Sequence, residues 1–286
     1  MNMWNGLQTH SSTRSRFQQF FNKMIPKILI IAGSDPSGGA GIQADLKTAA
    51  SHKTYAAAAI TCLTAQNTQK VFAIHNSPIP FLRQQLEVVL DDIKFDAIKI
   101  GMLGTVEIID CVADVLARKA KKIPLILDTV MVATSGDLLL EKKAVSALKI
   151  KLIAGAFLVT PNIDEAEILA EIKIKNLADI KRAATKIKAL GAKNILIKGG
   201  HLNFPDKKIR SILLDEKNNF HLITNRKIGI KNIHGTGCTL ASAIACNVAK
   251  KMNLLDAVRK ANAYVARGVA RNLKVGKGSL VLGFNA

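Results

Sequence analysis

Short apolar runs alternate with segments of helical periodicity along most of this chain, and no other feature of the sequence constrains the fold as strongly. Residues Lys27–Ala32 are apolar at almost every position, as expected for a strand that is buried on both faces of a parallel sheet. The glycine-rich segment Gly33–Gly41 follows, and apolar spacing after it predicts a helix from Ile42 to Ala50. A strand, a loop and a helix in this order form the repeating unit of parallel α/β proteins.

The strand–loop–helix order recurs along the chain. Further strands are expected at Ala56–Leu63, Asp96–Ile100, Ile123–Leu127, Ala156–Val159 and Asn194–Lys198. Helices are expected near Phe81–Asp91, Val106–Ala117, Lys142–Leu152, Glu165–Ala170, Leu177–Leu190 and Ala257–Val269. Residues Ile209–Leu214 and Phe220–Thr224 instead predict an antiparallel hairpin. We therefore predict a three-layer α/β/α fold with a mostly parallel central sheet, helices on both faces and a small antiparallel hairpin at the edge.

No linker, repeat or low-complexity segment divides the chain after its first strand, so residues 26–286 are predicted to form one domain. Residues 1–25 are polar and basic, contain no acidic residue and lack the apolar core of a secretory signal. We expect them to be a disordered or extended tail. Met24 stands just before the first strand, and a chain that begins there is expected to keep its activity.

The chain of 286 residues carries a net charge of +20, a value that raises the question of nucleic-acid binding. However, the lysines are spread over the predicted helices, aromatic residues are only 5% of the total, and no nucleic-acid-binding motif occurs. We therefore expect no nucleic-acid partner. No apolar run is long enough to span a bilayer, so no membrane partner is expected. The four cysteines show neither a CxxC pair nor metal-ligand spacing, which favours a reducing, cytoplasmic compartment.

Polar residues and glycines gather where the predicted strands end. In open α/β sheets, ligands bind outside the carboxyl ends of the strands. Any one of these residues could be a simple turn or cap residue, and only their shared placement predicts a ligand site. The residues at these positions are Gly33, Asp35, Gln66, Met102, Asp128, Asn162 and Lys198.

The segment Ile233–Leu240 reads Ile-His-Gly-Thr-Gly-Cys-Thr-Leu and turns directly into a predicted helix. Its two glycines allow a ligand to approach the backbone closely, and the free amides of a helix start can hold an anion. Cys238 lies in the same field, which is expected to lower its pKa and to favour the thiolate. An anion cradle with an acid–base group indicates phosphoryl transfer. The alternative is a glycine-rich helix start with a buried cysteine.

Taken in order, these motifs resemble those of the hydroxymethylpyrimidine/phosphomethylpyrimidine kinases, which belong to the ribokinase-like superfamily and act in thiamin biosynthesis. The likeness extends from about Ile28 to Val269. It rests on Gly33–Asp45, Ala65–Thr68, Lys99–Met102, Leu127–Met131, Thr160–Asn162 with Glu165, Lys198–His201 and His234–Cys238. The resemblance implies a ribokinase-like fold, ATP and Mg²⁺ as cofactors, and a homodimer. It also implies phosphorylation of 4-amino-5-hydroxymethyl-2-methylpyrimidine and then of its monophosphate to the diphosphate.

The resemblance assigns roles on the substrate side of the site. Gln66 would hydrogen-bond the aminopyrimidine edge, in a pocket that Gly33, Asp45 and Met102 shape. Cys238 would be the general base, at the position where other ribokinase-like enzymes carry an aspartate.

The resemblance also assigns roles on the phosphate side. The backbone amides of Gly235, Thr236 and Gly237, with that of Cys238, would form an anion hole for the phosphoryl group in transfer. Asn162 and Glu165 would organise Mg²⁺ and the ATP phosphates. Asp128 and Lys198 would lie beside those phosphates, and Asp128 would join Glu165 as a metal residue.

Two other functions stay open at this point. Pyridoxal kinases of the same cysteine-bearing branch use the same scaffold; some carry a reactive cysteine in the lid, whereas the lid-like segment Val132–Gly136 contains none. A non-catalytic nucleotide-binding protein could also keep this fold. The joint presence of Asp128, Glu165 and Cys238 favours an enzyme.

Overall fold

A computed structural model of the chain describes residues 25–132, 136, 139–141, 143–200, 208–226, 229 and 233–284. In this part of the chain the strands of the main sheet are β1 (Lys27–Ser34), β2 (Tyr55–Gln66), β3 (Val71–Asn76), β4 (Ala97–Ile100), β5 (Leu125–Leu127), β6 (Leu158–Val159), β7 (Asn194–Ile197), β8 (Lys208–Leu214) and β9 (Phe220–Arg226). The nine described strands lie in the order β3-β2-β1-β4-β5-β6-β7-β8-β9. Strands β2, β1, β4, β5, β6 and β7 run parallel, and β3 and the β8–β9 hairpin add antiparallel pairs at the two edges.

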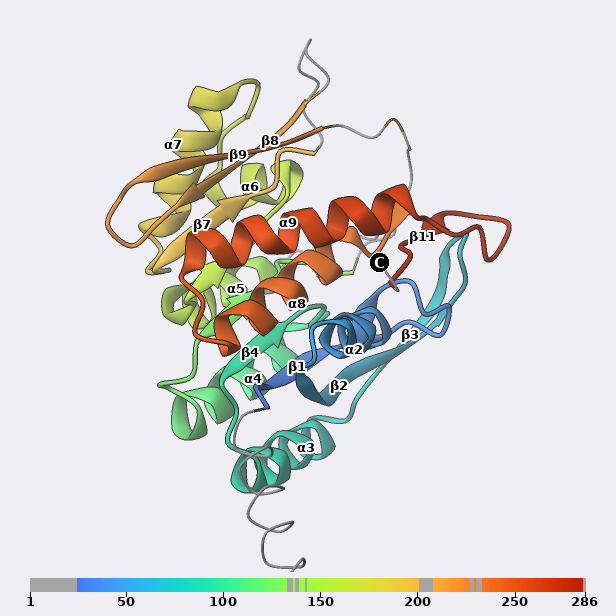
Figure 1. Cartoon of the computed structure of the whole chain (residues 1–286). Coiled ribbons are helices and arrows are strands. Elements are labelled where there is room, and N and C mark those ends of the chain that lie inside the picture. The colour runs from blue at the N-terminus through green and yellow to red at the C-terminus, as the bar shows by residue number, and fades with distance from the viewer. Residues whose placement is uncertain are drawn as a thin grey trace, which may run out of the picture.

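Helices cover both faces of this sheet (Figure 1). On one face lie α3 (Ile79–Asp92), α4 (Val106–Lys119), α5 (Ala144–Lys151), α6 (Ile163–Ala170) and α7 (Leu177–Lys188); on the other lie α2 (Gly41–Ser51), α8 (Thr236–Ala249) and α9 (Leu254–Ala270). Because successive side chains of a strand point to opposite faces, Leu29 and Ile31 of β1 enter the first core, and Ile28 and Ile30 enter the second. The predicted three-layer arrangement is confirmed.

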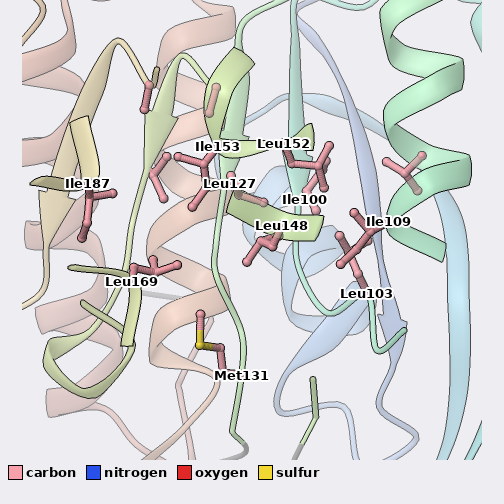
Figure 2. Packing of buried hydrophobic residues seen from close by; sticks show 14 of the residues in the cluster. Ile100, Leu103, Ile109, Leu127, Met131, Leu148, Leu152, Ile153, Leu169 and Ile187 are labelled. Carbon is pink, nitrogen blue, oxygen red and sulfur yellow. The ribbon is translucent and has the colours of Figure 1, made fainter. Parts of the chain in front are cut away.

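The larger core lies between the sheet and helices α3 to α7 (Figure 2). Ile100 of β4 and Leu127 of β5 are fully buried there, together with Leu148 of α5 and Ile109 of α4. Full burial of each such side chain stabilises the fold by about 1.5–3 kcal/mol. These contacts fix the carboxyl ends of β4 and β5, where two groups of predicted site residues begin.

Helix α8 is the central element of the second layer. Every residue from Thr239 to Ala249 is buried, which explains why this helix is apolar on all sides rather than on one stripe. It packs against α2 and α9 and crosses β1, β4 and β5. Its first turn therefore lies at the carboxyl ends of these parallel strands, where ligands bind in folds of this class.

Two parts of the sheet architecture differ from the prediction. Strand β2 does not end at Leu63 but continues to Gln66 and pairs with β3, which we did not predict. Most side chains of β3 are exposed, so it presents no buried run. Strands β10 (Ile233–His234) and β11 (Leu280–Val281) form a separate parallel pair of two residues each, too short for any periodic pattern.

The segment that leads from α9 to β11 also contacts the β2–β3 hairpin. The amide of Gly278 donates to Thr68 Oγ1 at 3.0 Å, and the amide of Ser279 donates to the Thr68 carbonyl at 2.7 Å. A Cβ atom at Gly278 would lie 2.1 Å from that carbonyl oxygen, so only glycine fits this close approach. The segment thus links the hairpin to β10, which leads directly into α8.

Some predictions fall on residues that the structure does not describe. These include residues 1–24 of the expected tail, residues 133–135 of the lid-like segment, Lys142 of an expected helix, and His201 of the Lys198–His201 motif. Among the described residues, no helix combines the length and the apolar character that a membrane span needs.

Candidate active site

The site is built around the first turn of α8. Gly235 is the N-cap and has φ 82°, a left-handed conformation that glycine adopts without strain. A Cβ atom there would lie 1.9 Å from the carbonyl oxygen of Gly39, so the start of α8 touches the backbone of the loop after β1. No described side chain caps this helix. The amides of Thr236, Gly237 and Cys238 therefore stay available for an anion.

An ion pair lies against this first turn. The Lys198 ammonium donates to Asp128 Oδ1 at 2.9 Å, and the hydroxyl of Thr160 donates to the same oxygen at 3.2 Å. A Cβ atom at Gly237 would lie 3.3 Å from Lys198 Nζ and 3.5 Å from Asp128 Oδ2. The structure therefore brings together three regions that are far apart in the sequence, at the ends of β5 and β7 and at the start of α8.

The charge of Lys198 is preserved despite burial. Burial acts to lower the pKa of this ammonium, but the carboxylates of Asp128 and Glu165 raise the pKa above its ordinary value. A fixed cation therefore lies beside the first turn of α8, an arrangement that is suited to phosphate.

Asn162 and Glu165 form a capping box at the start of α6. Asn162 Oδ1 accepts from the Glu165 amide, and Glu165 Oε2 accepts from the Asn162 amide, both at 2.9 Å. The same Glu165 oxygen accepts from the hydroxyl of Thr129 at 3.0 Å. Asn162 also forms an isolated parallel bridge with Lys198, so this pair lies next to the Lys198–Asp128 ion pair. The carboxylate of Glu165 is thus fixed by donors within the protein.

Cys238 corrects one prediction. We expected the helix start to lower its pKa, whereas burial raises the pKa of this thiol to about 11. The Lys99 ammonium and a hydrogen bond from the Gly41 amide lower the pKa, but they do not offset the loss of hydration. In the ligand-free protein, Cys238 is therefore a thiol at neutral pH.

A buried ion pair that we did not predict lies beside Cys238. Lys99 Nζ is 2.7 Å from Asp45 Oδ2, and Ser242, one helical turn after Cys238, donates to Asp45 Oδ1 at 2.6 Å. Neither charged side chain has exposed surface. Asp45 was assigned to the substrate pocket; since both its oxygens are bonded inside the protein, any effect on a pocket is indirect.

Gly33 and Met102, the other two residues assigned to the pocket wall, lie together. A Cβ atom at Gly33 would be 2.7 Å from Cys62 Sγ and 3.3 Å from Met102 Sδ, so a larger residue would displace both sulfur atoms. The hydroxyl of Thr61 donates to the Met102 carbonyl at 2.7 Å and fixes the turn after β4.

Gln66 lies at the end of β2, and its side chain reaches towards the start of α8. Its Nε2 atom is 3.1 Å from Nε2 of His234, which directly precedes the N-cap Gly235. The same ring nitrogen is 3.0 Å from Asp35 Oδ2. The sequence placed Asp35 among the strand-end residues of a predicted ligand site and His234 in a glycine motif, but it gave neither residue a specific role. The only sequence pattern that pointed to these two residues is that each adjoins a glycine loop.

The arrangement can hold an anion at the α8 amides, balance its charge with Lys198 and present the sulfur of Cys238 beside it. These are the groups that transfer of a phosphoryl group to a hydroxyl requires.

Comparisons with known proteins agree with this chemistry. The family model described as phosphomethylpyrimidine kinase matches residues 35–282. A hydroxymethylpyrimidine/phosphomethylpyrimidine kinase of Haemophilus influenzae is 44% identical over 256 residues, which cover 89% of this chain and 94% of that protein.

Two solved structures are also similar. The pyridoxal kinase of Staphylococcus aureus in complex with ADP has a TM-score of 0.84 and 34% identity, over 92% of this chain and 94% of that one. The phosphomethylpyrimidine kinase of Clostridium difficile 630 has a TM-score of 0.75 and 40% identity, over 86% of this chain and 99% of that one. With the match of the family model over most of its length, the chain belongs to the phosphomethylpyrimidine kinase family.

Proposed function

We propose that this protein uses ATP to phosphorylate 4-amino-5-hydroxymethyl-2-methylpyrimidine and then its monophosphate, which yields the diphosphate for thiamin biosynthesis. One observation carries the proposal. The five residues from His234 to Cys238 contact Gln66 at one end and adjoin Lys198 and Asp128 at the other. The same short segment therefore joins a side chain suited to an aminopyrimidine to groups suited to phosphate.

In the proposed reaction, the amides of Gly235 to Cys238 hold the oxygens of the phosphoryl group during transfer, and the Lys198 ammonium balances their charge. Cys238 must first be in its thiolate form, and it then accepts the proton of the substrate hydroxyl. Because burial raises the pKa of Cys238 to about 11, this role costs free energy at neutral pH, and the nearby Lys99 ammonium reduces that cost.

The residues present also fit Mg²⁺. Magnesium in kinases is held by one or two carboxylates together with substrate phosphates, and no dedicated cage of protein ligands is needed. Among the described residues, no group of three acidic, histidine or cysteine side chains forms such a cage. Asp128 Oδ2 faces the first turn of α8, and Asp128 would hold the ion there. The oxygens of Glu165 already accept hydrogen bonds within the protein, so Glu165 would support the ion indirectly and not as a direct ligand. Bound Mg²⁺ neutralises charge on phosphate oxygens.

Pyridoxal phosphorylation is the second candidate. It is favoured by the higher TM-score to the Staphylococcus aureus pyridoxal kinase, although the sequence identity to the Clostridium difficile phosphomethylpyrimidine kinase is higher. A coupled assay of ADP release over hydroxymethylpyrimidine, its monophosphate and pyridoxal separates the candidates. We expect turnover of both pyrimidines. Turnover of pyridoxal alone would overturn the proposal, and ATP binding without ADP release would indicate a non-catalytic protein.

We also propose a homodimer in the cytoplasm. Leu63, Phe72 and Ile74 of the β2–β3 hairpin are exposed large apolar side chains, which a second copy would cover. All four cysteines lie among the described residues and are free, as expected in a reducing compartment. Light scattering over a concentration series would test the dimer, and a purely monomeric profile would contradict it.

A further inference from the structure

Gln66, His234 and Asp35 form a short hydrogen-bonded chain that begins at the proposed pyrimidine pocket. One imidazole nitrogen, His234 Nε2, lies 3.1 Å from Gln66 Nε2 and 3.0 Å from Asp35 Oδ2. Asp35 and His234 are buried, and Gln66 is half-buried. Because His234 Nε2 faces a nitrogen on one side and a carboxylate oxygen on the other, the position of the hydrogen on this contact must be worked out.

Asp35 answers that question because it is a carboxylate that can only accept. Burial acts to raise its pKa, but hydrogen bonds from His234, from the hydroxyl and amide of Ser37 and from the Ala40 amide hold the pKa at about 2. An ionised carboxylate has no hydrogen to donate. The ring nitrogen that faces it must therefore be protonated, so Nε2 of His234 is a donor.

The orientation of the Gln66 amide follows. The single hydrogen of Nε2 points to Asp35, and a protonated ring nitrogen has no lone pair for an NH₂ group. The carbonyl oxygen of the amide, which shares that hydrogen weakly, can therefore face Nε2, and the NH₂ group cannot. The nitrogen and oxygen of a carboxamide are nearly isosteric and are assigned from the hydrogen-bond network. Exchanging them in Gln66 keeps the distances and gives His234 an acceptor.

Thr64 requires the same orientation independently. Its hydroxyl is 2.9 Å from the Ser34 carbonyl and 3.1 Å from the second amide atom of Gln66. A hydroxyl has one hydrogen, and the Ser34 carbonyl can only accept it. The hydroxyl therefore presents a lone pair to Gln66, which an NH₂ group fills and a carbonyl oxygen does not.

The imidazole itself has little freedom to turn. A Cβ atom at Gly39 would lie 2.7 Å from Cδ2 of His234 and 2.9 Å from Val281 Cγ1, so the loop after β1 packs directly on the ring. His234 also belongs to β10, whose pairing with β11 fixes its backbone. The ring is therefore held in place from two sides, and Asp35 determines that Nε2 is the nitrogen that carries the hydrogen.

We propose that His234, held by Asp35, is a positioning residue that fixes the Gln66 carboxamide with its oxygen towards the imidazole and thereby selects the hydrogen-bond pattern of the substrate. This inference rests on the proposed pyrimidine function. In the fixed orientation, Gln66 accepts from an exocyclic amino group and donates to the adjacent ring nitrogen, as a 4-aminopyrimidine requires. A 4-oxopyrimidine offers a carbonyl and a ring N–H in the reverse order, and the fixed amide does not pair with it in the same pose.

Selectivity kinetics test the proposal. The ratio of kcat/KM for the 4-amino substrate to that for its 4-oxo analogue is measured in the wild type, in Asp35→Asn and in the control Ser37→Ala. Ser37 bonds the far oxygen of Asp35 and leaves the contact with His234 intact. We expect the ratio to fall roughly 10-fold or more in Asp35→Asn, as for loss of one or two oriented hydrogen bonds, and to persist in Ser37→Ala. An unchanged ratio in a folded Asp35→Asn enzyme would overturn the proposal.

The protonation state of His234 gives a readout that needs no turnover. Long-range ¹H–¹⁵N spectra of the full chain with ¹⁵N-labelled histidine show which ring nitrogen carries hydrogen, and Asp35→Asn identifies the His234 signals by their shift. We expect a protonated Nε2 at neutral pH, and an unprotonated Nε2 would refute the inference. If the wild type failed to phosphorylate the aminopyrimidine, the function proposal alone would fail, and the spectra would still decide the orientation of Gln66.

Discussion

Lys99 and Asp45 form an ion pair with an N–O distance of 2.7 Å and with no exposed surface on either side chain. The pair joins β4 to α2, and Ser242 ties it to α8, so three elements around Cys238 meet at one buried charge pair. Burial alone would lower the pKa of Lys99, yet the carboxylates of Asp45 and Asp128 raise it, and the ammonium persists. A permanent cation therefore lies beside the thiol proposed as the base.

Removing one partner of this pair is expected to destabilise the fold strongly. Lys99→Met leaves Asp45 as an uncompensated buried charge and should lower the free energy of unfolding by about 3–5 kcal/mol. The double variant Lys99→Met with Asp45→Leu should recover most of that loss. Urea unfolding measures the stability of both variants. The control is Lys173→Met, which removes an ion pair from a side chain that is 81% exposed and should lower the free energy of unfolding by about 1 kcal/mol or less. Equal losses in the single and double variants would contradict this account.

Cys238→Ala should lower kcat by roughly 10²–10⁴, the usual range for loss of a general base. Both KM values should change little, because the backbone amides of α8 remain. Cys238→Asp should recover part of the rate, since a carboxylate can accept the same proton. Steady-state kinetics check this, and Cys111→Ala, on the opposite face of the sheet, serves as the control. Near-full kcat in Cys238→Ala would leave the anion hole as the source of catalysis.

The raised pKa of Cys238 predicts a particular pH dependence. Only the thiolate reacts with iodoacetamide, and with a pKa of about 11 its fraction grows about tenfold for each pH unit from 7 to 10. The alkylation rate of the ligand-free protein should rise over that range without a plateau, and ATP should protect the sulfur. Cys246, which has no exposed surface, should be spared. Mass spectrometry of the labelled cysteines measures the alkylation rate of each. A plateau below pH 9 would show that burial does not control the pKa of Cys238.

Gln66→Leu should raise the KM for the pyrimidine by an amount that corresponds to about 1–3 kcal/mol, because a polar edge of the substrate is left without partners. The KM for ATP should barely change. The control is Gln69→Leu, an exposed position in the turn of the same hairpin. Unchanged pyrimidine affinity in Gln66→Leu would show that the pocket lies elsewhere.

A chain that starts at Met24 should keep its activity and thermal midpoint. Ile25, where the described part of the chain begins, is exposed, and the next residue, Pro26, accepts a hydrogen bond from the Tyr55 amide of the sheet. Differential scanning fluorimetry with the ADP-release assay compares the two chains. Loss of folded protein after the truncation would show that earlier residues stabilise the domain.

Buried runs and glycine loops were sufficient to predict the parallel strands, the helices and the start of α8, because burial on both faces leaves a continuous apolar signal. Strand β3 left no such signal, since its side chains lie on an exposed edge. The predicted direction of the Cys238 pKa shift was wrong because only the field of the helix was considered. The cost of desolvation, which raises this pKa, depends on tertiary packing. Lys99 lies inside an apolar strand, and no local pattern reveals that Asp45, 54 residues earlier, neutralises it.

The contact of Gly278 and Ser279 with Thr68, followed by the pairing of β11 with β10, has a consequence during synthesis on the ribosome. The loop after β1 and the hairpin that carries Gln66 are translated early, but their support from residues 278–281 is translated more than 200 residues later. A nascent chain can complete most of its sheet before this last brace emerges from the exit tunnel. Under the roles proposed above, the pocket around Gln66 is therefore completed only at the end of translation, after the strands that carry it have been made.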